Sequence, residues 1–200
     1  MAKEGIPFIL VALAIAALFA IFGLWIGVVV FVLIAAFLAY FFRDPERHVP
    51  RDPNAILAAA DGRVTCITED AGGTRISVFM SPFDVHINRS PITGTIREII
   101  YSKGRKLPAT RNEASYVNER NTLVIEGDGL TVKCTQIAGI MARRIVCRPK
   151  IGDKIEQGER FGLIKFSSRT DVLVPSGFEV AVSIGDHVRG GETIIARRIS

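Results

Sequence analysis

Three short segments of the chain carry side chains of the types that do nucleophilic or acid–base chemistry. Two adjacent serines, Ser167 and Ser168, follow an apolar stretch, and a serine hydroxyl becomes a nucleophile when a base takes its proton. His86 stands in a polar segment bounded by prolines, and Asp61 stands in an Ala-Asp-Gly sequence. Taken alone, each has an ordinary structural explanation, as a strand end, a loop histidine and a turn.

The longer, C-terminal part of the chain has the pattern of a β protein. Short runs rich in valine and isoleucine, such as residues 75–80, 122–126 and 130–134, alternate with sequences typical of turns. One short helix is expected within residues 109–118. This part is long enough to bury one core, so we predict a single mostly β domain over residues 43–200.

A nine-residue pattern occurs twice in this domain. Ile151–Glu159 and Ile184–Glu192 share the pattern Ile-Gly-Asp-x-Ile/Val-x-x-Gly-Glu. Each copy predicts a strand, a tight Gly-Asp turn, a short strand and a glycine turn. The stretch resembles the flattened β-sandwich, or barrel-sandwich, of lipoyl- and biotinyl-type domains, but no lysine matches their carrier lysine. We therefore interpret the repeat as architecture and not as a cofactor arm.

The N-terminal part of the chain is a candidate membrane anchor. No charged residue occurs between Gly5 and Phe42, and one straight helix over this run would be about 55 Å long, against a hydrocarbon core of about 30 Å. We therefore favour a two-helix transmembrane hairpin over residues 1–42 that turns at Gly23–Gly27. The alternative is one steeply tilted span. Positive residues flank both ends, which predicts a cell-membrane protein with its β domain on the cytoplasmic side.

Charge and cysteine content restrict the classes of function. The net charge of +5 suits an anionic lipid surface. No basic run is interleaved with aromatic residues, so a nucleic-acid partner is not expected. The three cysteines show no CxxC or Cys/His spacing, so we expect reduced, buried thiols and no metal site. The basic residues that are candidates for contact with lipid phosphate, without individual roles, are Arg43, Arg47, Arg105, Lys106, Arg111, Arg143 and Arg144.

Considered together, the segments resemble the phosphatidylserine decarboxylase proenzyme family, in particular its short bacterial and archaeal branch. The resemblance extends over nearly the whole chain, and the order and spacing of its segments are more specific than any one motif. The matching segments are the apolar N-terminus, Phe42–Pro45, Ala60–Gly62, Ser81–Pro91, Asn118–Thr122, Gln136–Gly139, Ala142–Ile145, Phe161–Ile164 and Ser167–Arg169.

The resemblance implies a self-processing, pyruvoyl-dependent decarboxylase. In the family a serine attacks the peptide bond before it, the ester eliminates, and the resulting dehydroalanine hydrolyses to a pyruvoyl group. Ser168 matches that serine, which implies cleavage after Ser167 into a heterodimer of chains 1–167 and 168–200. Ser167 stands where the family usually has glycine, which implies slower processing. The pyruvoyl group would form a Schiff base with phosphatidylserine, and loss of CO2 would give phosphatidylethanolamine.

The family's acid–base residues match this chain only in part. Asp61 matches the family's aspartate and His86 the first of its two histidines. Arg89 occupies the second histidine position, and an arginine is not a general base at neutral pH. Either His86 serves both cleavage and decarboxylation, or cleavage depends on strain and on Asp61. His48 and His187 are poorer candidates, because they lie in a linker and in a repeat turn.

Two other functions stay open from the sequence. A non-enzymatic, membrane-tethered adaptor built on the lipoyl-like sandwich would have no need of Ser168. A decarboxylase of a related phosphoserine lipid, such as the archaeal ether analogue, would use the same head-group chemistry. A denaturing gel distinguishes the two possibilities, since the enzyme yields two chains and the adaptor stays intact. The sequence also leaves homo-oligomerisation open.

Overall fold

The chain divides into two compact units, Met1–Glu46 and Arg47–Ser200. The structure is a computed structural model. The residues that it describes are 1–111, 113–140, 145–165 and 168–199.

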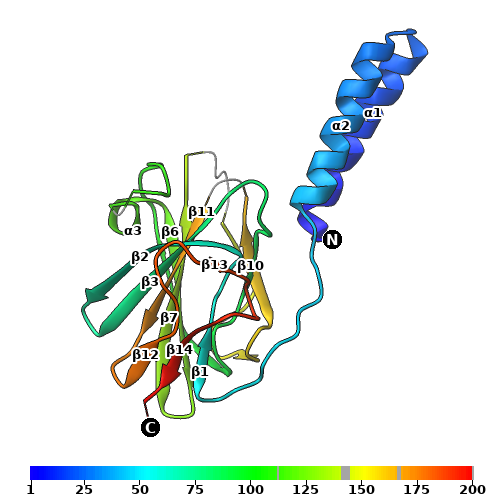
Figure 1. Ribbon diagram of the computed structural model, residues 1–200. Coiled ribbons are helices and arrows are strands. Elements are labelled where there is room, and N and C mark those ends of the chain that lie inside the picture. The colour runs from blue at the N-terminus through cyan, green and yellow to red at the C-terminus, as the bar shows by residue number, and fades with distance from the viewer. Residues whose placement is uncertain (112, 141–144, 166–167, 200) are drawn as a thin grey trace. The chain divides into compact units, whose positions relative to one another are not determined.

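The N-terminal unit is a pair of apolar helices. Its elements are a 3-10 turn at Lys3–Gly5, α1 at Ile6–Ile21 and α2 at Trp25–Phe41 (Figure 1). Gly23 makes the turn between the helices with a φ of +68°, a conformation that favours a residue without a Cβ. The Ala2 amide donates to the Phe42 carbonyl at 2.8 Å, so the two ends of the pair lie together. The predicted pair of helices is present, and α2 begins inside the segment predicted for the turn.

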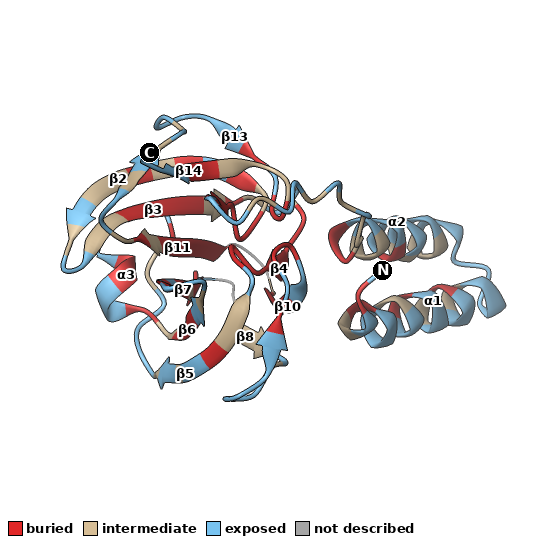
Figure 2. Cartoon of the chain, turned by 90° about the horizontal axis from the view of Figure 1, so that it is seen from below, coloured by how far each residue is buried: buried red, intermediate tan, exposed pale blue. Residues whose placement is uncertain are grey.

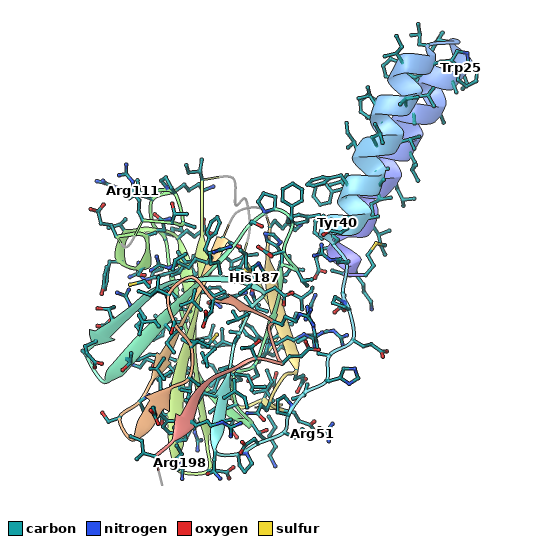
Figure 3. The ribbon with its side chains drawn as sticks, in the orientation of Figure 1. Trp25, Tyr40, Arg51, Arg111, His187 and Arg198 are labelled. Carbon is teal, nitrogen blue, oxygen red and sulfur yellow. The ribbon has the colours of Figure 1, made fainter. Side chains whose placement is uncertain are left out.

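The two helices pack on each other but leave most of their apolar surface exposed. Gly27 leaves room for the ring of Phe19, which stacks on Phe31 with 5.6 Å between the ring centroids. Trp25, at the start of α2, is 69% exposed (Figure 3). The helix over Lys3–Ile21 is long and apolar enough to cross a membrane, and α2 is a shorter apolar helix. An apolar surface of this extent marks a site of interaction with a membrane or a partner.

The second unit is mostly β, as predicted. Its elements are β1 (Ala55–Leu57), β2 (Gly62–Asp70), β3 (Gly73–Met80), β4 (Ile87–Arg89), β5 (Gly94–Ser102), α3 (Ala114–Val117), β6 (Arg120–Gly127), β7 (Leu130–Ala138), β8 (Ile145–Cys147), β9 (Lys154–Ile155), β10 (Arg160–Ile164), β11 (Ser168–Val174), β12 (Phe178–Val180), β13 (His187–Val188) and β14 (Ile194–Arg198). A curled, antiparallel eight-stranded sheet has the order β13-β2-β3-β11-β7-β6-β5-β9 (Figure 1). Two three-stranded sheets have the orders β1-β14-β12 and β4-β10-β8. The helix α3 lies within the segment predicted to be helical.

The core lies against one face of the eight-stranded sheet. Val172 of β11 pairs with Ile76 of β3 and with Cys134 of β7, and all three side chains are fully buried in the main hydrophobic cluster. Burying an aliphatic side chain of this size contributes about 1.5–3 kcal/mol. Figure 2 shows β3 and β11 as mostly buried strands in the middle of the sheet. A group at the start of β11 is therefore held from both sides by neighbouring strands.

The two copies of the repeat occupy the two edges of the eight-stranded sheet. In the first copy β9 pairs with β5, and in the second copy β13 pairs with β2. Their Gly-Asp turns are held alike. The Gly152–Asp153 turn exchanges two backbone hydrogen bonds with Ile96, and the Gly185–Asp186 turn exchanges two with Val64. The same sequence pattern thus makes the same contact at both edges.

Candidate active site

Ser168 is the first residue of β11 and is completely buried. It pairs with Met80 of β3 on one side and with Ala138 of β7 on the other. Its hydroxyl donates to the Met80 sulfur at 3.8 Å, and a thioether is a weak acceptor. Ser167, the other residue of the predicted cleavage site, lies outside the described residues. Ser168 is therefore held between two strands and is shielded from water.

The three segments predicted to carry catalysis meet around one small apolar cluster. Four side chains, each exposed by 1% or less, form it: Ala60, Met80, Ala138 and Ile164. Ala60 directly precedes Asp61, and Met80 and Ala138 are the strand partners of Ser168. The Ile164 amide donates to the His86 carbonyl at 3.4 Å, so His86 adjoins the cluster as well. The fold thus gathers segments that are far apart in the sequence.

His86 is buried and oriented by its own loop. Its ring Nδ1 lies 2.9 Å from the Asp84 carbonyl oxygen. A carbonyl only accepts, so Nδ1 carries the proton of the neutral ring and Nε2 is the basic nitrogen. The Asp84 carboxylate accepts from the Ser81 amide at 2.8 Å and from the Ser81 hydroxyl at 2.6 Å, which closes the turn before His86.

A second histidine lies beside the same loop. The Nε2 atom of His187, in β13, is 3.6 Å from Oδ1 of Asp84 (Figure 3). Its place in a repeat turn makes His187 a poorer candidate from the sequence, and the pairing of β13 with β2 brings it to this loop. The His187 side chain is 60% exposed, so this contact contributes little to stability. It nevertheless links the segment after Ser168 to the loop that carries His86.

Asp61 is held by an ion pair and by a backbone hydrogen bond. Its Oδ2 lies 2.7 Å from the Arg47 guanidinium, and its Oδ1 accepts from the Gly190 amide at 2.9 Å. Arg47 also reaches Glu192 at 3.4 Å, and the His48 amide donates to Glu192 at 3.0 Å. Desolvation raises the pKa of Glu192, but the His48 amide and the Arg47 guanidinium outweigh it, so the pKa lies below its ordinary value. Arg47 thus lies between the carboxylates of Asp61 and Glu192.

These contacts change the interpretation of Arg47 and add a second role for Asp61. The sequence makes Arg47 a candidate for contact with lipid phosphate. Its side chain is 7% exposed and pairs with two carboxylates, so it is not available to bind a lipid phosphate. The first copy of the repeat has a similar contact. There the Thr93 hydroxyl accepts from the backbone amide of Gln157 at 2.9 Å, and Gln157 has the same position in its copy as Gly190 has in the second copy. Asp61 therefore orders a repeat loop, and its catalytic role stays a prediction.

The other candidates for lipid contact differ in their surroundings. Arg105, Lys106 and Arg111 are exposed on the segment between β5 and α3 (Figure 3 labels Arg111). The Arg43 guanidinium lies over the Tyr40 ring, 3.9 Å from its centroid. The remaining two, residues 143 and 144, lie outside the described residues.

Replacing Arg47 with glutamine should lower the free energy of unfolding by about 2–3 kcal/mol, because it leaves the carboxylate of Asp61 without its cation. Urea unfolding of the uncleaved Ser168→Ala chain measures this. The matched control is Arg197→Gln, since Arg197 pairs with Asp52 at 2.8 Å but is 56% exposed. That control should cost at most about 1 kcal/mol. Equal losses of unfolding free energy in the two variants would show that the Arg47 pair stabilises the fold no more than an exposed pair does.

Arg89, at the position of the missing second histidine, is buried where the repeat copies meet. Its guanidinium donates to the carbonyl of Gly158, in the first copy, at 3.0 Å. A Cβ added to Gly191, in the second copy, would lie 2.7 Å from Cδ of Arg89. The arginine therefore fits closely between the copies and has a structural use there.

Sequence reasoning does not identify three buried amide side chains that lie near Ser168. Gln136 donates to the side-chain oxygen of Asn88 at 2.8 Å, and Asn121 donates to Gln136 at 3.2 Å. The Asn88 nitrogen reaches the same Met80 sulfur as the Ser168 hydroxyl, also at 3.8 Å. The available signal was the presence of amides at inward positions of apolar strands, where they are at most 4% exposed.

The cysteines are free thiols, as expected. Cys66 and Cys134 are buried, and Cys147 is half-buried. Burial raises the pKa of the Cys134 thiol, and burial also raises that of Cys147 against an opposing hydrogen bond from Asn121. Neutral thiols of this kind are poor nucleophiles.

Comparison with known proteins gives one consistent match. The model of the family described as phosphatidylserine decarboxylase matches residues 34–196. A phosphatidylserine decarboxylase proenzyme of Solibacter usitatus is 46% identical over 197 residues, which cover 98% of this chain and 96% of that protein. The corresponding proenzyme of Nitrosomonas europaea is 45% identical over 203 residues, covering 98% and 94%. That of Magnetococcus marinus is 42% identical over 207 residues, again covering 98% and 94%.

A match of this extent, on a fold with a buried serine at the start of a central strand, defines a carboxy-lyase that is made as a proenzyme and generates its own pyruvoyl group. The chain belongs to the phosphatidylserine decarboxylase family. The resemblance inferred from the sequence and the predicted enzyme class are therefore confirmed.

Proposed function

We propose that this protein decarboxylates phosphatidylserine to phosphatidylethanolamine with a pyruvoyl group that it makes from Ser168. The observation that carries the assignment to this residue is its position. Ser168 is buried at the start of β11, between Met80 and Ala138. Family membership supports the reaction, and the position of Ser168 supports the choice of nucleophile.

The surroundings of Ser168 suit a reactive carbonyl. The buried apolar side chains of the adjoining cluster exclude water from that side. The pyruvoyl group would condense with the substrate amine and accept the electron pair that is released with CO2. His86 would then return a proton to the substrate carbon, since a neutral-range acid is best suited to that step.

The self-cleavage begins with attack of Ser168 Oγ on the carbonyl carbon of residue 167. The hydroxyl proton passes to a base, a C–O ester bond forms, and the C–N bond breaks to leave an amine on residue 168. Loss of the Cα proton of residue 168 expels the carboxylate of residue 167 and leaves dehydroalanine. Water then replaces the nitrogen, which leaves as ammonia. We favour His86 as the base because Arg47 already occupies the carboxylate of Asp61.

The two chains made by this cleavage should stay together as a heterodimer. Residues 168–200 supply β11, β13 and β14, which pair with β3, β7, β2 and β1 from the part before the cleavage site. Arg169 is fully buried and donates to the carbonyls of Ala109 and Arg111 at 3.4 and 3.1 Å. These contacts do not depend on an intact bond between residues 167 and 168, so only denaturation should separate the products.

The role of the repeat in this enzyme is architectural. Its two copies close the edges of the sheet, and they meet where a Cβ added to Gly191 would lie 3.4 Å from Cα of Gly158. This similar use of both copies supports the interpretation of the stretch as a barrel-sandwich without a carrier lysine.

The helical pair would anchor the enzyme in the cell membrane, with the catalytic domain on the cytoplasmic side. Helices of 16 and 17 residues are about 24 and 26 Å long, slightly short of a hydrocarbon core of about 30 Å. Trp25 at the turn suits the membrane interface. The outward apolar side chains then lie in an environment that matches them.

A cysteine added directly after Met1 and one placed at Asn54 should both react with a membrane-impermeant maleimide from the cytoplasmic side, because a hairpin returns the chain to the side where it began. Both positions are exposed, and the test uses a chain whose three native cysteines are changed to alanine. Inside-out and right-side-out vesicles give the comparison. Labelling from opposite sides would mean a single span and would exclude the hairpin.

The proposed function is tested by the purified protein on a denaturing gel together with release of CO2 from phosphatidylserine in mixed vesicles. We expect two chains and CO2 release. One intact chain without CO2 release would favour the non-enzymatic adaptor.

A further inference from the structure

We propose that the end of the eight-stranded sheet at which Ser168 lies is a membrane-binding surface, and that Phe83 and Ile140 insert there among the lipids of the bilayer that holds the substrate. This surface belongs to the β domain and acts in addition to the helical anchor. The proposal rests on the proposed function, because it describes how the same site reaches its lipid.

The first reason is that the loops around Ser168 leave the sheet at one end. Ser168 begins β11, and it pairs with Met80, the last residue of β3, and with Ala138, the last residue of β7. The loop after β3 carries Phe83, and the chain after β7 carries Ile140. Both side chains therefore lie within a few residues of the strand partners of the reactive serine.

The second reason is that both side chains are large, apolar and mostly exposed. Phe83 is 67% exposed, and Ile140 is 57% exposed. The turns that enter β3 and β7 at the opposite end of the sheet, residues 71–72 and 128–129, are Ala-Gly and Asp-Gly. Turns of that composition are usual where a loop faces water. The loops beside Ser168 thus differ from the hairpin turns at the other end of the same strands.

The third reason is that a closed β-turn presents Phe83. The Asp84 amide donates to the Ser81 carbonyl at 3.0 Å, and the Asp84 carboxylate accepts from the Ser81 amide and hydroxyl. Pro82 and Phe83 are therefore the two central residues of the turn. Small and polar residues or proline are usual at such positions. A large exposed ring fixed there, near a second exposed apolar side chain, marks a surface of interaction.

The substrate identifies the partner of this surface as a bilayer. Position 168, which would carry the reacting carbonyl, is completely buried, and the substrate amine is joined to acyl chains. Each CH2 group that leaves a bilayer lowers the equilibrium constant for withdrawal by about fourfold. The acyl chains therefore stay in the lipid, and the site has to come to the head groups. The loops that flank Ser168 then meet the bilayer first.

The charges near this end suit an anionic lipid surface. The guanidinium of Arg169, the residue after Ser168, donates to the Arg111 carbonyl at 3.1 Å, so the segment between β5 and α3 adjoins the start of β11 (Figure 3 labels Arg111). Glu113 is an exposed carboxylate of that segment. Its exposed cations are more numerous: Lys103, Arg105, Lys106 and Arg111. Anionic head groups attract such cations.

Tryptophan fluorescence of the full chain in vesicles tests the contact directly. Trp25 is the one tryptophan of the sequence, so Trp25→Phe gives a background without tryptophan. Phe83→Trp and, separately, Ile140→Trp then each place a single reporter on the surface. The matched control is Ile151→Trp, since Ile151 is 65% exposed and precedes the turn that bonds to Ile96, near the start of β5 at the opposite end of the sheet.

We expect the Phe83→Trp and Ile140→Trp reporters to emit at shorter wavelength than the Ile151→Trp reporter and to lose intensity in lipids brominated on their acyl chains, because the ring leaves water for lipid. Quenching of both surface reporters no stronger than that of the control would overturn the proposal. Emission at shorter wavelength without quenching would also overturn it, because protein and not lipid would then cover the ring.

A ratio of rates shows whether the contact serves the reaction. The double variant Phe83→Ser/Ile140→Ser is compared with Ile151→Ser and with the parent, on phosphatidylserine in vesicles and on short-chain phosphatidylserine dissolved as monomers. The ratio of the two rates cancels effects on folding and on processing. We expect this ratio to fall by about tenfold or more in the double variant, since tenfold corresponds to about 1.4 kcal/mol, less than the burial of one such side chain contributes. Ile151→Ser should keep the ratio of the parent, and an equal ratio in the double variant would contradict the proposal.

The outcome for the parent chain separates this proposal from the proposed function. A parent that splits and releases CO2, together with surface reporters that lipid does not quench, would refute the membrane-binding surface alone. A parent that neither splits nor releases CO2 would refute the proposed function. The fluorescence measurement needs no catalytic activity, so it decides on the surface in either case.

Discussion

Changing Ser168 to alanine should leave one intact chain with no decarboxylase activity. The alanine has no hydroxyl to attack the preceding carbonyl, so neither the ester nor the pyruvoyl group forms. The protein should still fold, because the buried Ser168 hydroxyl donates to the Met80 sulfur, which is a weak acceptor. A denaturing gel and a CO2-release assay on the same preparation measure the two losses.

The neighbouring serine provides the control for this prediction. Ser167→Ala should still split, and Ser167→Gly should split as fast as the parent or faster, since glycine restores the conformational freedom usual at this position in the family. If Ser168→Ala splits and Ser167→Ala does not, the nucleophile is Ser167.

Changing His86 to alanine should lower decarboxylation by about 10²–10⁴-fold, the usual effect of losing a general acid–base residue. Of the three histidines, His86 is buried next to the cluster at Ser168, and its Nδ1 is held by the Asp84 carbonyl. Nε2 is thereby set as the nitrogen that takes up or returns a proton. The steady-state rate is to be expressed per processed chain, so that slow cleavage is not counted as slow decarboxylation.

The effect of His86→Ala on cleavage separates the two roles that the sequence left open. If His86 also replaces the missing second histidine, the variant stays uncleaved; if cleavage depends on strain and on Asp61, it splits normally but turns over little lipid. His187→Ala is the matched control, since His187 lies beside the same Asp84 but is 60% exposed, and its rate should change by less than about tenfold. Normal cleavage and normal turnover in His86→Ala would remove His86 from the mechanism.

The sequence predicted those parts of the fold that local patterns determine. Uncharged residues from Gly5 to Phe42 with glycines near the middle indicate two helices, and short valine-rich runs between turns indicate strands. The two copies of the repeat could be seen in the sequence, but their places at opposite sheet edges could not, because edge positions depend on long-range pairing.

The sequence identifies the segments that form the candidate site but not the contacts between their side chains. Ser168, His86 and Asp61 were identified from their matches to a family, and the structure brings their segments to one cluster. The Arg47–Asp61 pair joins residues from different segments, so no spacing rule indicates it. The hydrogen bonds of the Asn88 side chain depend on the register of β4 and β11 and on the close approach at Gly162. The sequence shows the glycine but not the register.

The mass spectrum of the purified, denatured protein tests the central claim most directly. The account predicts two chains, residues 1–167 and residues 168–200, with the smaller one lighter by one ammonia than the same fragment with an N-terminal serine. Treatment with a hydrazine should add mass to the smaller chain alone, since it alone carries a ketone. A single intact chain, or a fragment 168–200 that retains a serine amine, would contradict the account.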